Sequence, residues 1–300
     1  MSRRLAIVIL AGVMLATTAS AAAGDGPSGS TQVRRGAFPG ANGKIVFRAL
    51  AGDNEIARVS PNATGLVDLT DNVLDDSSPA WNAKGNRIAW VQDGDVWIMR
   101  ANGTEARQVT HTERAEYEVA WAPSGDRLAV VRDTLDYELF VIGLDGRTIS
   151  RVTRTPYGEA DVSWSPDGEL LLYTGEDAEG TNQVFTIRPD GTRRRKLTNL
   201  SSSYAGGWHP NGRRIVFFSN AGSYQLFRMS RTGDNIVQLT FSEWDNEQPT
   251  YSPDGLSLVW TDDFDGDYEI VTAPLSNLGS PTQLTANDTH DSAPDWQPTR

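Results

Sequence analysis

The sequence predicts an all-β protein, a six-bladed β-propeller whose blades are four-stranded antiparallel sheets. Two short patterns recur along the chain. The first is an aromatic residue followed four residues later by a glycine, as in Trp164 and Gly168. The second is an aliphatic residue before a threonine, and successive threonines are 40, 43, 45, 42 and 45 residues apart: Thr70, Thr110, Thr153, Thr198, Thr240 and Thr285. A repeat of about 40–45 residues with four short apolar runs is typical of propeller blades.

The unit from residue 162 to residue 198 shows how one blade is predicted. Its short apolar or alternating segments predict strands at 162–164, 170–174, 183–188 and 194–198. Pro166 and Gly168 suit a tight turn between the first two strands, and Asp190-Gly191 suits a hairpin turn between the last two. The other units fit the same template.

The two ends of the repeat complement each other. The first unit begins near Pro39 and has a second strand at 44–47, but it lacks a first strand. After the final Leu284-Thr285 pair, the segment Ser292–Trp296 has the pattern of a first strand with nothing after it. We expect this C-terminal strand to complete the first blade, which closes the ring and removes an open sheet edge.

The repeats resemble those of a known family. Trp164-Ser165-Pro166-Asp167-Gly168 and Tyr251-Ser252-Pro253-Asp254-Gly255, each with its Leu-Thr ending, resemble the WD40-like repeats of the TolB propeller. The resemblance covers about residues 38–300 and implies the same propeller fold. Members of that family carry an α/β domain ahead of the propeller, where this sequence has a short leader.

Residues 1–23 are predicted to be a signal peptide, and residues 24–37 a flexible Gly/Ser/Thr-rich leader. Arg3 and Arg4 precede an apolar run at 5–16, which small residues follow. The alternative is an uncleaved membrane anchor, but a spanning helix needs roughly 20 apolar residues. We therefore expect no membrane span after cleavage and a periplasmic, cell-wall-associated or extracellular location.

Composition excludes several classes of function. The chain has 39 acidic and 27 basic residues, for a net charge of −12, so nucleic acid is not an expected partner. Anionic membrane surfaces are disfavoured for the same reason. There is no cysteine, which excludes disulfides, thiol catalysis and thiolate metal sites.

The predicted strand directions divide the connections between two faces. Tight turns join the first strand to the second and the third to the fourth, and together they form one face. The loops between strands two and three, and those that link blades, form the other. These loops are longer, differ between blades and are rich in Asp and Glu. Binding residues usually lie in such loops, so we expect a protein partner to bind there.

A ring of polar residues is predicted where this loop-rich face meets the central channel. Counting five residues back from each first-strand aromatic gives Asp76, Glu116, Glu159, Ser203, Asn246 and Asp291. If these side chains converge, the carboxylates of Asp76, Glu116, Glu159 and Asp291 would suit Ca²⁺ or a cationic ligand. The alternative is a structural role, in which each residue bonds to the backbone of a neighbouring blade.

Aromatic residues on the same face are candidate contacts for a protein or for sugar rings: Tyr117, Tyr157, Tyr204 and Trp244. Packing of each aromatic against its own blade is the alternative. Catalysis has little support, because the three histidines are scattered and no Ser-His-Asp pattern is evident. The sequence thus predicts a non-catalytic binding or scaffolding module. A polysaccharide-directed lyase or hydrolase, or a sugar-binding module, using the same channel mouth is the alternative.

Overall fold

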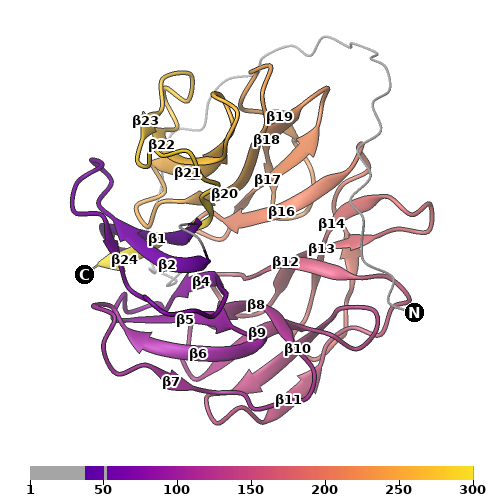
Figure 1. The fold of residues 1–300 in the computed structure, drawn as a ribbon. Helices are drawn as coiled ribbons and strands as arrows, with labels where there is room; N and C mark the ends of the chain where they lie inside the picture. The colour runs from indigo at the N-terminus through magenta and orange to yellow at the C-terminus, as the bar shows by residue number, and fades with distance from the viewer. Residues whose placement is uncertain (1–37, 51–52, 300) are drawn as a thin grey trace, which may run out of the picture.

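The computed structural model describes residues 38–50 and 53–299. The signal peptide predicted at 1–23 and the leader predicted at 24–37 lie outside the described residues. Six four-stranded antiparallel sheets surround a central axis as blades (Figure 1). The predicted all-β, six-bladed architecture is therefore confirmed. Within the described ranges, no helix is long and apolar enough to cross a membrane.

The first three blades are numbered in ring order, starting from the blade that contains both ends of the propeller. Blade 1 contains β24 (Ser292–Thr299), β1 (Ala41–Leu50), β2 (Asn54–Val59) and β3 (Val67–Asp68). Blade 2 contains β4 (Asp76–Trp81), β5 (Arg87–Gln92), β6 (Asp95–Arg100) and β7 (Arg107–Gln108). Blade 3 contains β8 (Glu116–Trp121), β9 (Arg127–Arg132), β10 (Glu138–Gly143) and β11 (Thr148–Arg151).

The remaining three blades repeat this order from the innermost to the outermost strand. Blade 4 contains β12 (Glu159–Trp164), β13 (Leu171–Glu176), β14 (Asn182–Ile187) and β15 (Arg195–Lys196). Blade 5 contains β16 (Ser203–Trp208), β17 (Arg214–Asn220), β18 (Tyr224–Ser230) and β19 (Val237–Gln238). Blade 6 contains β20 (Asn246–Tyr251), β21 (Ser257–Asp262), β22 (Glu269–Pro274) and β23 (Thr282–Gln283).

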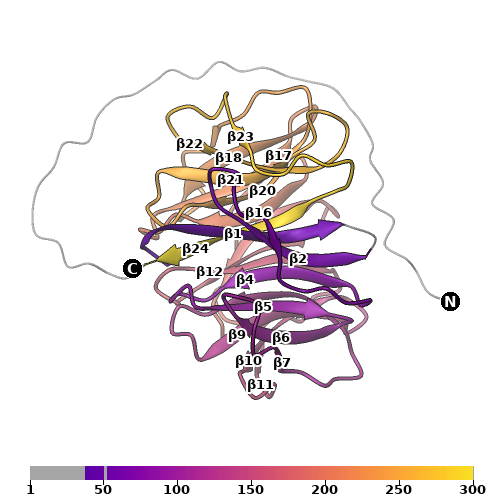
Figure 2. The ribbon, with the colours of Figure 1, turned by 60° about the vertical axis from the view of Figure 1, so that its left-hand side comes forward.

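The C-terminal strand closes the ring, as predicted. β24 pairs antiparallel with β1, and Trp296 lies opposite Ile45 (Figures 1 and 2). The Gln297 amide links two blades, since its Oε1 accepts a hydrogen bond from Lys44 N (3.0 Å) and its Nε2 donates to Gly85 O (2.6 Å). β24 thus gives blade 1 an innermost strand, as each of the other five blades has.

The aliphatic–threonine pairs have one role in all six blades. Each threonine Oγ1 accepts a hydrogen bond of 2.8 or 2.9 Å from a backbone N–H in the third strand; the donors are Ile56, Val96, Leu139, Val184, Leu226 and Ile270. The threonine side chain thus replaces strand pairing at this point. For this reason β15 covers only Arg195–Lys196, which is shorter than the 194–198 predicted.

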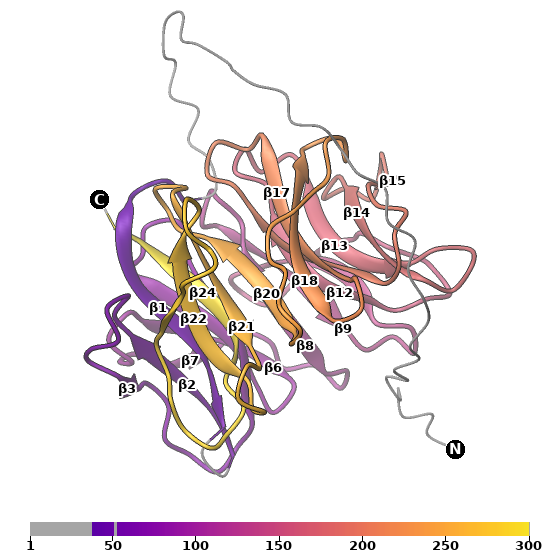
Figure 3. The ribbon, with the colours of Figure 1, turned by 90° about the horizontal axis from the view of Figure 1, so that it is seen from above.

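The core is a ring of interfaces between blades, which Figure 3 shows as neighbouring sheets that face each other. Trp164 of blade 4, which is 5% exposed, packs in one cluster with Ala120 and Ala122 of blade 3. Between blades 5 and 6, a Cβ on Gly206 would lie 2.6 Å from Pro249 O, so only glycine allows this approach. The packing of the first strands of neighbouring blades therefore sets the spacing of the blades.

We call the side on which the first strands begin the loop face. It carries the loops between blades and the loops between second and third strands, for example 69–75 and 133–137. We call the opposite side the turn face. It carries the turns between first and second strands, such as 82–86, and those between third and fourth strands, such as 101–106.

Candidate functional site

The six residues predicted to ring the channel mouth lie at the loop-face ends of the first strands. Five of them begin β4, β8, β12, β16 and β20, and the sixth directly precedes β24. They are Asp76, Glu116, Glu159, Ser203, Asn246 and Asp291, and none is more than 2% exposed. Because they are buried, these side chains do not line an open mouth.

Hydrogen bonds within the propeller occupy these side chains. Glu116 Oε2 accepts from Thr110 Oγ1 (2.9 Å), and its Oε1 accepts from Arg132 Nε (2.8 Å). Asp76 accepts from Trp90 Nε1 (2.9 Å) and from Asn72 Nδ2 (3.0 Å). Because Thr110 ends blade 2 and Glu116 begins blade 3, this bond ties neighbouring blades together.

The same pattern extends round the ring. Three further ring residues each form a hydrogen bond with the linking-loop residue four positions earlier in the chain. The pairs are Thr155 with Glu159 (2.6 Å), Ser242 with Asn246 (2.6 Å) and Asn287 with Asp291 (2.9 Å). Across the described residues, no group of three or more His, Asp or Glu side chains is placed to hold a metal ion. The structure therefore does not bring Asp76, Glu116, Glu159 and Asp291 together around a shared Ca²⁺.

Burial also changes the protonation of these carboxyl groups. Burial raises the pKa of Glu159 to about 7, although hydrogen bonds from Thr155 and Thr153 oppose the change. Burial raises the pKa of Glu116 as well, and the nearby Arg132 guanidinium opposes it. Buried carboxyl groups with hydroxyl partners suit a structural role, which was the alternative considered from the sequence.

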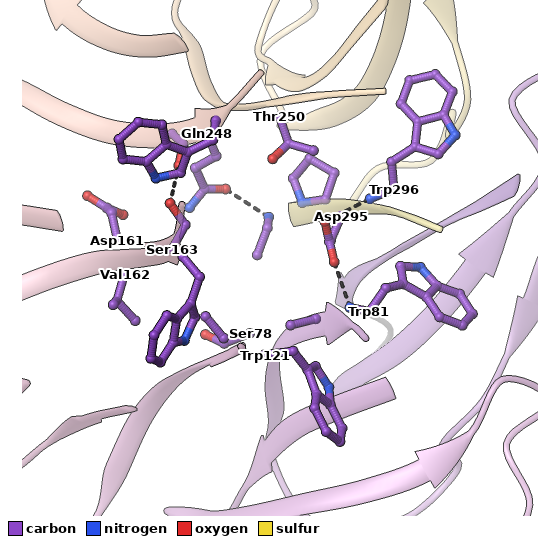
Figure 4. A pocket seen from close by; sticks show the side chains of 18 of the residues that line it. Ser78, Trp81, Trp121, Asp161, Val162, Ser163, Gln248, Thr250, Asp295 and Trp296 are labelled. Carbon is purple, nitrogen blue, oxygen red and sulfur yellow. Dashed lines mark hydrogen bonds between the residues drawn. The ribbon is translucent and has the colours of Figure 1, made fainter. Parts of the chain in front are cut away.

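The structure has a cavity in the channel that sequence reasoning did not find. Its volume is about 240 Å³, and the later residues of the first strands line it (Figure 4). Phe38 and Pro253 lie at its turn-face end. Three acidic residues, Glu118, Asp161 and Asp295, line it, whereas no Lys, Arg or His does so. The cavity is below the usual size of sites for drug-sized ligands.

β-Bulges place polar side chains along this cavity. The register between first and second strands shifts between Ser77 and Ala80 and, in blade 4, between Ala160 and Ser163. At the bulge, φ is +51° at Ser78, +54° at Asp161 and +51° at Gln248. Bulges re-aim side chains. A polar residue two positions after four of the six predicted ring residues was the available signal: Ser78, Glu118, Asp161 and Gln248.

Several bulge side chains join adjacent blades. Glu118 Oε2 accepts a hydrogen bond from Val162 N (3.0 Å), and Gln248 Oε1 accepts one from Ala293 N (2.8 Å). Figure 4 shows Asp295 bonded to Trp81 and Trp296, and both backbone N–H groups donate to it at 2.6 and 2.9 Å. Burial raises the pKa of Asp295 to about 6 despite these donors.

Asp161 is a strongly perturbed carboxyl group in the cavity. Burial, reinforced by the nearby Glu118 carboxylate, raises the pKa of Asp161 to about 8, although the Thr174 hydroxyl donates to it at 2.6 Å. At pH 7 the group is therefore largely protonated. The cavity accordingly offers hydrogen-bond donors as well as acceptors.

Replacing Asp161 by asparagine tests this protonation state. Asparagine tolerates positive φ and keeps an acceptor for Thr174. A carboxyl group whose pKa is raised by folding contributes stability below its unfolded pKa and loses it as pH rises through the folded pKa. The unfolded pKa of an aspartate is about 3.9, so part of this stability is already lost at pH 5. Asp161→Asn should therefore increase stability by about 1–3 kcal/mol more at pH 9 than at pH 5.

Urea unfolding at both pH values measures this difference. Asp71→Asn removes the same charge from an exposed loop-face position and serves as the control. Equal effects of Asp161→Asn at pH 5 and pH 9 would contradict the raised pKa.

The four predicted aromatic contacts differ in exposure. Trp244 is 42% and Tyr117 is 44% exposed, and Tyr117 packs edge-on against Tyr137 with ring centroids 5.1 Å apart. Tyr204 is half-buried and stacks on Phe218 at 5.0 Å, and Tyr157 is also half-buried. Trp244 and Tyr117 are thus available to a partner, whereas packing accounts for part of Tyr204.

Exposed apolar side chains gather on the loop face. Of the fourteen large hydrophobic residues exposed in the described part of the chain, eight lie there: Val73, Leu74, Tyr117, Leu135, Leu200, Phe241, Trp244 and Phe264. Of the other six, Leu66, Ile236 and Leu256 lie in turns of the turn face, and Val67, Ile149 and Val237 lie on outer strands.

Residues 62–300, well over half of the chain, match the family model for the TolB beta propeller domain, PD40. The chain belongs to this family. It is 32% identical over 180 residues to the protein TolB homolog of Chlorobium luteolum, a match that covers 58% of this chain and 41% of the relative. The corresponding protein of Chlorobaculum tepidum is 30% identical over 129 residues, covering 42% of this chain and 27% of that one.

The fold is also similar to a solved TolB structure. The crystal structure of TolB from Acinetobacter baumannii superimposes with a TM-score of 0.74 at 16% identity and covers 86% of this chain and 67% of that one. At this identity the likeness shows the fold alone. The matched segments span less than half of the length of these two relatives.

Proposed function

We propose that this chain is an exported, non-catalytic binding propeller whose loop face docks a protein partner. The observation that carries the proposal is the gathering of exposed apolar side chains on that face. Val73 is 90%, Leu135 86% and Phe241 78% exposed. These side chains come from loops of several blades on the same face, and aromatic residues such as Trp244 are enriched where partners bind.

Charge on the same face adds to the argument. Loop-face acids such as Asp75, Asp136 and Asp245 accompany the apolar groups. A polar, charged rim around apolar anchors is the usual composition of a protein interface. The acids favour a partner with a basic surface, whose approach they would accelerate. Membership in the TolB propeller family and the signal peptide predicted at 1–23 support an exported binding module over an intracellular one.

The proposal predicts that loop-face substitutions weaken binding without loss of stability. Residues 24–300 would be used to capture the partner from the native extract, and the partner would be identified by mass spectrometry. We expect the triple variant Val73→Ser, Phe241→Ser and Trp244→Ser to bind that purified partner at least tenfold more weakly than the parent, because interface anchors are lost.

A matched triple variant provides the control. Leu66→Ser, Ile149→Ser and Leu256→Ser remove exposed apolar side chains from the outer strands and the turn face. We expect this variant to bind like the parent and both variants to melt like it. Equal weakening by the two triple variants would show that the loop face is not the docking surface.

A further inference from the structure

A second concave site lies on the turn face, between blades 2 and 3. It is a cleft of about 340 Å³. Lys84, Asn86 and Arg87 line it from the first turn of blade 2, and Pro123, Ser124 and Leu144 line it from blade 3. Among the described residues that line it, there is no Asp or Glu.

The bases of this cleft are left without acidic partners. In the described part of the chain, Lys84 and Arg87 form no ion pair. The acids nearby are already paired: Glu105 with Arg100 (2.8 Å), Asp126 with Arg127 (3.3 Å) and Asp145 with Arg147 (3.7 Å). A third base, Arg107, contacts a lining residue without lining the cleft itself, since its Nη1 donates to Leu144 O (3.3 Å).

Among the five turns that join a first strand to a second, only that of blade 2 has a basic residue before the glycine. Lys84 stands where blades 4 and 6 have Asp167 and Asp254, and where blades 3 and 5 have the neutral Ser124 and Asn211. Those aspartates cap their own turns; Asp167 Oδ1, for example, accepts from Ser165 Oγ (2.6 Å) and Glu169 N (3.0 Å). Residues that break a local pattern are often functional.

Another side chain has taken over the capping in blade 2. Asn82, which is 6% exposed, accepts hydrogen bonds from Asn86 N (3.0 Å) and Arg87 N (3.1 Å) through its Oδ1. The turn is thus held rigid without an acid. The Lys84 ammonium group, on an exposed residue, needs no partner within the turn.

Arg87 is placed at an electrostatic cost. It lies directly opposite Arg100 in the β5–β6 register. Like charges directly opposite one another destabilise a sheet. An anion bound beside Arg87 would relieve that repulsion, and a guanidinium can bind a carboxylate through two parallel hydrogen bonds.

We infer that this cleft binds a carboxylate side chain from an acidic segment of a protein partner. Lys84 and Arg87 provide the charge, Asn86 and Ser124 provide polar contacts, and Pro123 and Leu144 contact the methylene groups of the bound side chain. The volume suits one or two side chains and lies at the low end for small-molecule sites.

The net negative charge of the chain does not prevent this binding. Six-residue strands separate the turn face from the acidic loop face by roughly 20 Å. That separation exceeds two Debye lengths at physiological ionic strength, about 8 Å each. The local charge of the cleft therefore governs binding there, and the two faces suit partners of opposite charge.

The test uses a fluorescently labelled hexaglutamate peptide and residues 24–300 of the chain. Fluorescence anisotropy should show saturable binding of hexaglutamate and none of hexaglutamine. The variant Lys84→Gln with Arg87→Gln should bind at least tenfold more weakly. The control, Arg213→Gln with Arg214→Gln, removes two exposed turn-face arginines of blade 5 and should change binding less than twofold; Arg214 begins its second strand as Arg87 does.

Three outcomes would overturn the inference. If both double variants bind hexaglutamate equally weakly, the attraction is a diffuse effect of charge. If the parent does not bind hexaglutamate, the cleft is not a carboxylate site. Binding of digalacturonate without binding of hexaglutamate would show that the site takes an acidic sugar. The triple loop-face variant should bind hexaglutamate like the parent, so failure here and failure of the loop-face proposal are distinguishable.

Discussion

Removal of residues 292–300 is expected to abolish cooperative thermal unfolding. This deletion takes away β24, whose pairing with β1 is the closure of the ring. It also removes Trp296, which is 4% exposed in the core cluster of blades 1 and 6, and Asp295, which accepts a hydrogen bond from Trp81 N. The inner edge of β1 and the apolar surface that Trp296 covers between blades 1 and 6 would then face water. Circular dichroism during heating would show a broad transition in place of a single sharp one.

A circular permutant separates loss of the strand from loss of its position at the C-terminus. In this variant, residues 292–300 are moved ahead of residue 38, so that β24 precedes β1 as a first strand precedes a second in every other blade. Since Thr299 already pairs with Ala41, the two strands can be joined by a short turn. The permutant should melt like the parent. A truncated chain that also melted like the parent would contradict closure by β24.

Replacing Trp164 with alanine is expected to destabilise the protein by about 3–5 kcal/mol, the usual range for a buried aromatic side chain. Trp164 is 5% exposed and fills the interface between blades 3 and 4, where it packs with Val162, Leu171 and Tyr173 among others. Blades 3 and 4 cannot shift toward each other to fill the space left by the tryptophan, because backbone pairing holds each sheet rigid. Urea unfolding monitored by circular dichroism would measure the change.

Trp244→Ala is the matched control, because Trp244 is 42% exposed on the loop face. Its effect on stability should be within about 0.5 kcal/mol, as for most surface substitutions. The two variants should also differ in binding. Trp244→Ala should weaken partner binding in the folded protein, whereas Trp164→Ala should act through stability. If both substitutions destabilise equally, the assignment of Trp164 to the core is wrong.

The position of the six predicted ring residues followed from the repeat, but their role did not. Counting back from the first-strand aromatics located residues such as Glu116 and Asp76 at the correct end of the strands. Counting could not show that Thr110 and Asn72 would bond to them. Those partners come from linking loops, whose path depends on how two blades pack. For that reason an open ring of ligands was predicted where the structure has buried anchors.

The cavity and the cleft were missed for two different reasons. The cavity depends on bulges with positive φ at residues such as Asp161, and a pattern of alternating apolar residues contains no bulge signal. The cleft depends on Lys84, which was visible as a departure from the turn pattern, but its significance depends on blade 3 lying beside it. Neither site is formed by residues of a single blade.

The sequence by itself determined the fold class, the number of blades, their turns and the closure by Ser292–Trp296. These features depend on local periodicity and turn chemistry, which each blade repeats within about 40–45 residues. Which side chains are accessible depends on the tertiary structure. Glu159 and Asp291 are buried, Phe241 and Trp244 are exposed, and Lys84 has no acidic partner among the described residues. Accessibility is set by the packing of one blade against the next, and residues far apart in the chain contribute to every such interface.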